Sequence, residues 1–165
     1  MNGRIFRFGD DIDTDQLAPG QYMKGGLEAL AAHCLEGVHP DFAAAVRPGD
    51  VLVAGRNFGM GSSREQAAQA LKHLGLAGVV ALSFAGIFYR NAINLGLPAL
   101  VAADLSGVED GDLAEFDLGS GQLRLIARGS AVALEPLPDN LKRMLADGGL
   151  VPHLKKRFLQ EREKA

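Results

Sequence analysis

The sequence contains a single cysteine, Cys34, among its 165 residues. One thiol cannot form a disulfide within the chain, and it cannot supply the several thiolates that hold an iron–sulfur cluster or a structural zinc ion. The four histidines are scattered without the spacing of metal ligands. We therefore expect a protein of a reducing, cytoplasmic compartment, with no metal site of its own.

An excess of positive charge and a long apolar run are also missing. The 17 Lys and Arg residues stand against 20 Asp and Glu residues, a net charge of −3, so no broad positive field attracts nucleic acid or an anionic membrane. The most apolar stretch, residues 79–88, is far shorter than the roughly 20 residues that cross a bilayer. The first residues lack the apolar segment of a signal peptide. These absences predict a soluble protein that binds neither nucleic acid nor membrane.

The overall composition is that of a folded protein with an unusual amount of glycine. Hydrophobic residues make up 47% of the chain and charged residues 22%, which is enough apolar material for a core. The length predicts one compact domain over residues 1–165. Glycine occurs 21 times, well above the usual share of about 7%, so many backbone positions are expected to need a positive φ or a close approach.

Short apolar segments alternate with amphipathic segments in the first two thirds of the chain. The pattern predicts strands over residues 4–8, 51–54, 79–82 and 98–101, with helices over residues 27–37, 41–46, 65–75 and 87–95. Strands separated by helices indicate right-handed crossovers and a parallel sheet. The prediction is an α/β fold in which a largely parallel sheet is flanked by helices.

The pattern changes in the last third. Residues 113–118, 122–127 and 131–134 alternate polar and apolar side chains between glycine-containing turns, which predicts a small antiparallel β extension. Two helices, over residues 139–146 and 151–159, are predicted to end the chain.

A glycine-rich turn between a predicted strand and a predicted helix is the most informative segment. Residues 55–65 read Gly-Arg-Asn-Phe-Gly-Met-Gly-Ser-Ser-Arg-Glu. The turn does not match a P-loop, a dinucleotide fingerprint or a nucleophile elbow. Its glycines and Arg64, at the sheet edge where α/β proteins bind ligands, favour an anion site at the helix N-terminus. The structural alternative is a capping box, in which Ser62 and Glu65 only start the helix.

An acidic segment and a glycine-containing loop lie near the start of the chain. Residues 10–15 read Asp-Asp-Ile-Asp-Thr-Asp, but Gln16 and Tyr22 stand where a calcium loop needs glycine and glutamate. Taken alone, the acidic segment reads as a solvated, turn-forming loop. Residues 22–26 are predicted to form a flexible loop, in which Lys24 is either solvated or able to reach an acidic ligand.

Three segments together resemble the small subunits of the isopropylmalate dehydratase and homoaconitase family. They are Asp-Ile-Asp-Thr-Asp at 11–15, the glycine-rich turn at 55–65, and Ser-Phe-Ala-Gly-Ile-Phe at 83–88 followed by Asn91 and by Asn-Leu-Gly at 94–96. The resemblance runs from about Arg4 to the C-terminus. It implies the fold of the aconitase swivelling domain and a hydro-lyase that isomerises a hydroxy di- or tricarboxylate. It also implies a large-subunit partner that carries a [4Fe–4S] cluster, in a heterodimer or heterotetramer.

The resemblance also assigns roles to residues. Ser62 matches the family's catalytic base, Arg64 a ligand of a substrate carboxylate, and Asp15 an active-site acid, with Ser63 beside them as a further substrate-binding residue. Serine is a base only as an alkoxide, which backbone N–H groups, a helix N-terminus and a guanidinium can stabilise.

The residues after the acidic segment are implied to set the substrate. Lys24 can pair with an additional carboxylate, as in a homocitrate-type substrate, whereas Tyr22 and Met23 can pack against an isopropyl or methyl group. We rank 3-isopropylmalate, and with it leucine biosynthesis, ahead of homoaconitate or a methylated malate. A different class stays open, namely a non-catalytic module that binds a carboxylate or phosphate.

Overall fold

Four short parallel strands form the centre of the protein. The computed structural model of the chain describes residues 2–163. In it, β1 (Asn2–Arg7), β2 (Val51–Ala54), β3 (Gly78–Ala81) and β4 (Ala99–Val101) pair side by side in the order β4-β3-β2-β1. Every residue of β2 and β3 is buried, as expected of parallel strands that are covered on both faces. The predicted parallel sheet is confirmed.

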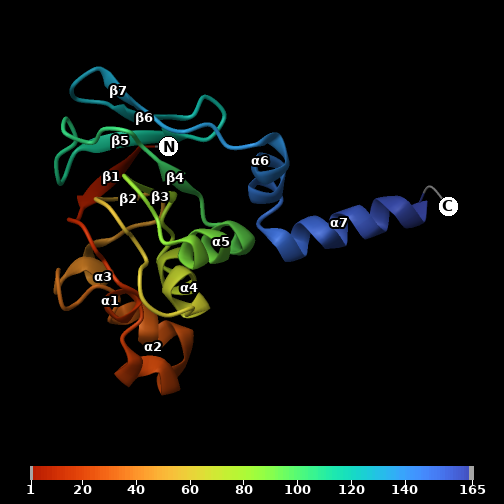
Figure 1. Ribbon diagram of the computed structural model, residues 1–165, viewed down its shortest axis with the longest axis horizontal. Coiled ribbons are helices and arrows are strands. Elements are labelled where there is room, and N and C mark those ends of the chain that lie inside the picture. Colours follow the sequence, from red (N-terminus) through yellow and green to blue (C-terminus); the bar gives the residue numbers. More distant parts are fainter. Residues whose placement is uncertain (1, 164–165) are drawn as a thin grey trace.

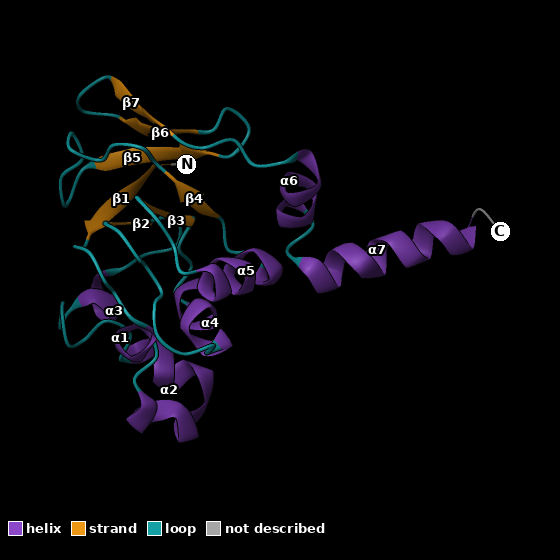
Figure 2. Cartoon of the chain, in the orientation of Figure 1, coloured by secondary structure: helices purple, strands orange, loops and turns teal. Residues whose placement is uncertain are grey.

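Three antiparallel strands continue this sheet beyond β1. They are β5 (Leu113–Asp117), β6 (Gln122–Leu125) and β7 (Ser130–Ala133). The first half of β1 pairs with β5 in the antiparallel sense, and the second half pairs with β2 in the parallel sense. The predicted β extension is therefore joined edge to edge to the parallel strands in one seven-stranded mixed sheet, drawn in orange in Figure 2.

The helices gather mainly on one side of the parallel strands. Figure 1 shows α1 to α5 below these strands, β5 to β7 above them, and α7 projecting away from both. The helices are α1 (Thr14–Leu17), the 3₁₀ helix η1 (Gly20–Gly25), α2 (Gly26–Ala32), α3 (Phe42–Ala45), α4 (Glu65–His73), α5 (Gly86–Leu95), α6 (Asp139–Ala146) and α7 (Leu150–Glu163). None of the described helices is long and apolar enough to cross a membrane.

Two local predictions are wrong. The segment expected to be a flexible loop over residues 22–26 is largely the 3₁₀ helix η1. The acidic segment is not a simple loop, because Asp13 caps α1: its side chain accepts a hydrogen bond from Gln16 N, and the Gln16 side chain bonds back to the backbone of Asp13. This reciprocal pair is a capping box, and it turns the chain sharply after the acidic residues.

An aromatic cluster fixes the glycine-rich turn on the core. The buried ring of Phe58 lies edge-on to Phe88 of α5, with ring centroids 5.1 Å apart. Gly59 has φ +79°, and a Cβ atom at this position would lie 2.2 Å from the Phe88 ring. Only glycine fits this conformation and this contact. The turn is therefore held against α5 by packing, and its polar residues face outward.

Candidate active site

The acidic segment and the glycine-rich turn lie side by side and share backbone hydrogen bonds. Asp11 N donates to Arg56 O at 2.8 Å, Gly59 N to Ile12 O at 2.7 Å, and Thr14 N to Met60 O at 2.8 Å. The bonds run in both directions, so each segment fixes the backbone of the other. Two motifs that are far apart in the sequence are thus one structural unit.

Most of the acidic side chains support this unit. Asp10 Oδ1 accepts a hydrogen bond from Arg56 N at 2.7 Å, and Asp11 Oδ1 accepts one from Asn57 Nδ2 at 2.8 Å. Because their carboxylates bind the neighbouring turn, the interpretation of the acidic segment as a merely solvated loop is wrong.

Ser62 does not cap α4. The N-cap residue of α4 is Arg64, and no side chain bonds to the free amides of the first turn. Instead, Ser62 Oγ lies 3.1 Å from Thr14 Oγ1, and Ser62 N donates to the same threonine oxygen at 3.0 Å. The capping-box alternative for Ser62 and Glu65 is therefore wrong, because the helix begins at Glu65, too late for Glu65 to be its third residue.

Thr14 and Gly61 set the position of the Ser62 hydroxyl. Thr14 is buried, with 2% of its surface exposed, whereas Ser62 is exposed. Gly61 has φ +109°, and a Cβ atom there would lie 3.0 Å from Thr14 Oγ1. A side chain at position 61 would press on the threonine that holds Ser62, so glycine is needed for both conformation and space.

Arg64 links the turn to α1. Its Nη1 donates to the Asp15 carboxylate and, at 3.1 Å, to the carbonyl oxygen of Ala18. The Arg64 side chain is 28% exposed and that of Asp15 is 71% exposed. The structure thus brings together three predicted residues, Ser62, Arg64 and Asp15, with Ser63 exposed between the first two. A serine hydroxyl and a guanidinium that both contact α1 or the residue after it, just before the N-terminus of α4, are suited to bind an anion.

The helix η1 with Lys24 begins beside the guanidinium. A Cβ atom at Gly20 would lie 4.0 Å from Arg64 Nη2. Lys24 is exposed and makes no hydrogen bond or ion pair with any residue in the described range 2–163. Its ammonium group is therefore available to a ligand.

Sequence reasoning missed a cluster that Tyr22, two residues before Lys24, forms with His33 and Glu36. Tyr22 stacks on His33, and His33 Nδ1 lies 2.6 Å from Glu36 Oε2. The hydrogen bond from His33 holds the pKa of the Glu36 carboxyl below its usual value, and a bond to Glu36 raises the pKa of the Tyr22 hydroxyl. No sequence pattern pairs these residues, which meet only because α2 and the turn after it fold back on η1.

The third segment packs behind the turn. Asn57 N donates to Ser83 Oγ at 2.8 Å, and Phe58 N donates to Ser83 O at 3.0 Å. Ala85 N returns a bond to Phe58 O at 2.9 Å. The segment after β3 therefore braces the backbone of the glycine-rich turn, so all three sequence motifs converge on one site.

Comparisons with known proteins show the family to which this chain belongs. Residues 36–104 match the family described as the aconitase C-terminal domain. The chain is 52% identical over 154 residues to the methanogen homoaconitase small subunit of Methanothermobacter thermautotrophicus, and the aligned region covers 93% of this chain and 89% of that protein. It is 49% identical over 158 residues to a 3-isopropylmalate dehydratase small subunit of Archaeoglobus fulgidus, and here the aligned region covers 94% of this chain and 95% of the relative. The chain belongs to the small subunits of the aconitase family.

A solved structure shows that this aconitase-family small subunit has the fold of its relatives. The crystal structure of a 3-isopropylmalate dehydratase from Methanocaldococcus jannaschii superposes with a TM-score of 0.93 at 44% identity, covering 99% of this chain and 98% of that one. The protein is thus one subunit of an aconitase-type hydro-lyase, either an isopropylmalate dehydratase or a homoaconitase. The description of its relatives as small subunits implies a large-subunit partner.

The donor groups of this small subunit do not fit an iron–sulfur cluster. The one thiol of the chain, Cys34, is buried in the hydrophobic core, and burial raises the pKa of that thiol. A cluster needs several thiolates on accessible cysteines. Residues of this chain therefore cannot form the ligand set of such a cluster.

Proposed function

We propose that this small subunit supplies the base and the carboxylate-binding groups of a two-subunit dehydratase that acts on 3-isopropylmalate. The observation that carries the proposal is the placement of Ser62. Its hydroxyl is exposed, bonded to Thr14 instead of the helix, and joined through the same turn to Arg64. Because Ser62 does not cap α4, its hydroxyl is available to react with a substrate.

The reaction moves water between two adjacent carbons of a hydroxy acid through a cis-alkene. It requires removal of a weakly acidic C–H proton next to a carboxylate, together with loss of hydroxide. When bound to the large subunit, a [4Fe–4S] cluster would supply the Lewis acid that assists the loss of hydroxide. This division of labour is supported by the single buried thiol of the small subunit.

Ser62 would accept the proton on its Oγ atom. The reactive form is the alkoxide. The Thr14 hydroxyl lies 3.1 Å from Ser62 Oγ, and the Arg64 guanidinium and the N-terminus of α4, two and three residues further along the same turn, would add positive potential. Because the reaction is reversible, the protonated hydroxyl would return the proton when water adds to the alkene.

Arg64 would hold a substrate carboxylate. Its planar fork binds two carboxylate oxygens at once, which a lysine cannot do. Asp15 and the Ala18 carbonyl hold Nη1 and so orient the fork. The exposed hydroxyl of Ser63 would add a hydrogen bond to the same carboxylate.

Lys24 favours a second candidate substrate, a tricarboxylate such as homoaconitate. Its unpaired ammonium can bind a third carboxylate directly. We rank 3-isopropylmalate first because the apolar stem of the lysine can also flank an alkyl group while its charge stays in water. Met23, next to it, is 37% exposed and offers further apolar surface.

Reconstitution tests the proposal. The purified small subunit is expected to be colourless and inactive, and to gain dehydratase activity when mixed with a large subunit whose cluster has been rebuilt anaerobically. Stoichiometric iron and sulfide on the small subunit alone would overturn the division of labour. Activity across 3-isopropylmalate, homoaconitate and methylated malates would rank the substrates.

The same experiment separates the enzyme from a non-catalytic binding module. Calorimetry of the isolated small subunit with each hydroxy acid and with phosphate measures binding without the partner. Micromolar affinity alone, with no activity after mixing, would favour the binding module.

A further inference from the structure

Thr14 is one of two buried polar residues in the described range 2–163, and it lies against Ser62. Its oxygen Oγ1 accepts a hydrogen bond from Ser62 N at 3.0 Å and lies 3.1 Å from Ser62 Oγ. One threonine oxygen therefore contacts both the backbone and the side chain of the proposed base.

The backbone of Thr14 is fixed on both sides, but its hydroxyl is not used by its own helix. Thr14 N donates to Met60 O at 2.8 Å, and Ala18 N donates to Thr14 O at 2.9 Å. Thr14 is the first residue of α1, so no helical carbonyl precedes it to accept a hydrogen bond from its hydroxyl. The hydroxyl is left for a contact outside the helix.

The surroundings of Thr14 set the direction of the bond between the two hydroxyls. A threonine hydroxyl has one proton to donate, and within the described chain Ser62 Oγ is the only acceptor in reach of Thr14 Oγ1. Because a buried donor is nearly always satisfied, the Thr14 proton points to Ser62 Oγ. The exposed Ser62 hydroxyl can then turn its own proton to solvent or to a substrate.

This direction matters most when Ser62 is charged. An alkoxide has no proton to donate, so donors from its surroundings must stabilise it. Thr14 contacts Oγ directly from a buried position, where a hydrogen bond is stronger than in water. No hydrogen bond joins Arg64 to Ser62 in the described chain, because Arg64 Nη1 is bonded to Asp15 and to the Ala18 carbonyl.

We propose that Thr14 is a positioning residue that donates its hydroxyl proton to Ser62 Oγ and so stabilises the alkoxide that removes the substrate proton. The inference rests on the proposed role of Ser62 as the base. Ser62 first loses its proton to water. The substrate C–H proton then bonds to Oγ, and the electron pair of the broken C–H bond forms the alkene as hydroxide leaves, while Thr14 keeps its own proton throughout.

Two variants of Thr14 separate hydrogen bonding from packing in the reconstituted enzyme. Thr14→Val keeps the shape and removes the hydroxyl, and it is expected to reduce kcat about 10²- to 10³-fold, as for loss of one donor to an oxyanion. Because Thr14 is buried and does not touch the substrate, KM should stay near the wild-type value. Thr14→Ser keeps the hydroxyl and should retain most of kcat. The opposite order, an active Thr14→Val and an impaired Thr14→Ser, would overturn the proposal.

A third variant keeps the test decisive if Thr14→Val does not fold. Thr14→Cys replaces the hydroxyl with a thiol, which is a weak donor. Its kcat is expected to lie well below that of Thr14→Ser. Equal kcat in these two variants would overturn the proposal.

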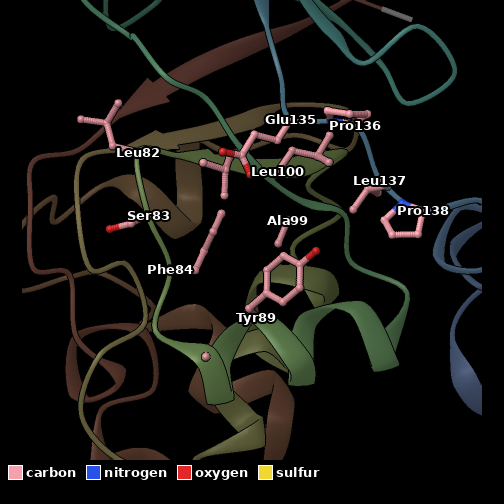
Figure 3. Close-up of a pocket in the computed structure, with 12 residues that line it drawn as sticks. Leu82, Ser83, Phe84, Tyr89, Ala99, Leu100, Glu135, Pro136, Leu137 and Pro138 are labelled. Carbon is pink, nitrogen blue, oxygen red and sulfur yellow. The ribbon is translucent and has the colours of Figure 1, made fainter.

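Ser83→Ala is the matched control for bracing of the turn. Ser83 lies next to Phe84 on the segment after β3 (Figure 3), and its Oγ accepts a hydrogen bond from Asn57 N at 2.8 Å. The variant removes a hydroxyl that holds the turn without contacting Ser62, so kcat should fall by no more than about tenfold, the effect of one neutral hydrogen bond. A loss as large as that of Thr14→Val would make bracing the explanation and would overturn the proposal.

A substrate deuterated at the carbon that loses its proton reports on proton removal itself. Thr14→Val slows this step, so its primary deuterium isotope effect on kcat is expected to be at least as large as that of the wild-type enzyme. A smaller isotope effect would mean that a different step has become limiting, and it would overturn the proposal.

A double variant separates the role of Thr14 from the proposed function. If Thr14 acts only through Ser62, adding Thr14→Val to Ser62→Ala should cause no further loss of kcat. A further loss of tenfold or more would overturn the inference. Near-normal kcat in Ser62→Ala would refute the proposed base itself. Near-normal kcat in Thr14→Val beside an impaired Ser62→Ala would refute only the role of Thr14.

Discussion

The phenol ring of Tyr22 lies flat on the imidazole ring of His33, with ring centroids 3.5 Å apart and an angle of 6° between the planes. His33 is held in turn by Glu36, whose carboxylate lies 2.6 Å from Nδ1. These contacts attach η1 to the segment after α2. Since Lys24 is two residues from Tyr22 in η1, the stack fixes the backbone that carries the lysine.

We therefore expect His33→Ala to weaken the discrimination between substrates in the reconstituted enzyme. An aromatic pair contributes about 0.5–1.5 kcal/mol, so the ratio of kcat/KM for homoaconitate to that for 3-isopropylmalate should move by about two- to tenfold. His33→Phe keeps a ring for stacking and should restore most of the ratio. His73→Ala, at an exposed histidine of α4, is the control. An unchanged ratio in His33→Ala would limit His33 to a structural role.

Ser62→Ala is expected to reduce kcat by about 10²- to 10⁴-fold, the usual contribution of a general base. The free energy of unfolding should change by less than about 0.5 kcal/mol, because Ser62 does not cap α4. Steady-state kinetics and thermal unfolding of the same preparation measure both effects. Ser130→Ala, on exposed β7, controls for the loss of a surface hydroxyl. Near-normal kcat in Ser62→Ala would exclude this serine as the base.

Arg64→Lys is expected to lower kcat/KM although the positive charge is kept. A lysine cannot bond to the Ala18 carbonyl, to Asp15 and to both oxygens of a substrate carboxylate in one plane. The loss should be about 1.5–3 kcal/mol, as for a charge-assisted hydrogen bond. Arg56→Lys is the matched control, since Arg56 is an exposed arginine of the same turn. Equal kcat/KM for the two variants would argue against substrate binding by Arg64.

Lys24→Leu is expected to shift the preference from tricarboxylate to alkyl substrates. Loss of one charge-assisted bond should change the kcat/KM ratio for homoaconitate against 3-isopropylmalate by about 1.5–3 kcal/mol. Lys24→Arg keeps the charge and should keep the preference. If the ratio does not move in Lys24→Leu, the lysine is solvated in the complex and the substrate end is recognised by Met23 and its neighbours.

The stability of the α6–α7 junction should depend on pH through Asp147. The hydrogen bonds from Lys156 and from His153 hold the pKa of the Asp147 carboxyl below its usual value of 3.8. A folded-state pKa below the unfolded value means that the carboxylate stabilises the fold above about pH 5 and loses this effect as the pH falls through the folded pKa. Asp147→Asn should therefore lower Tm at pH 7, and this difference in Tm should shrink as the pH falls below about 4. A Tm difference between the two proteins that does not shrink on acidification would contradict this assignment.

The sequence was sufficient for the order and type of most elements because the signals are local. Continuous apolar runs predicted β2 and β3. Gly75, with φ +83°, follows α4 before β3, and Gly96, with φ +78°, follows α5 before β4. Local signals failed where a distant segment competed for a side chain. Ser62 matched a capping box, but the buried Thr14 hydroxyl binds it instead.

The sequence by itself determined the α/β class, the family and the three motifs that form the candidate site, since these depend on periodicity and on runs of contiguous residues. Only the tertiary structure decided that Asp10 and Asp11 brace the glycine-rich turn, that Asp15 orients Arg64, and that Tyr22 is held by His33. The physical reason is that hydrogen bonds and ring contacts between segments depend on where the backbone places both partners. That placement comes from the packing of the sheet and helices, which no single segment encodes.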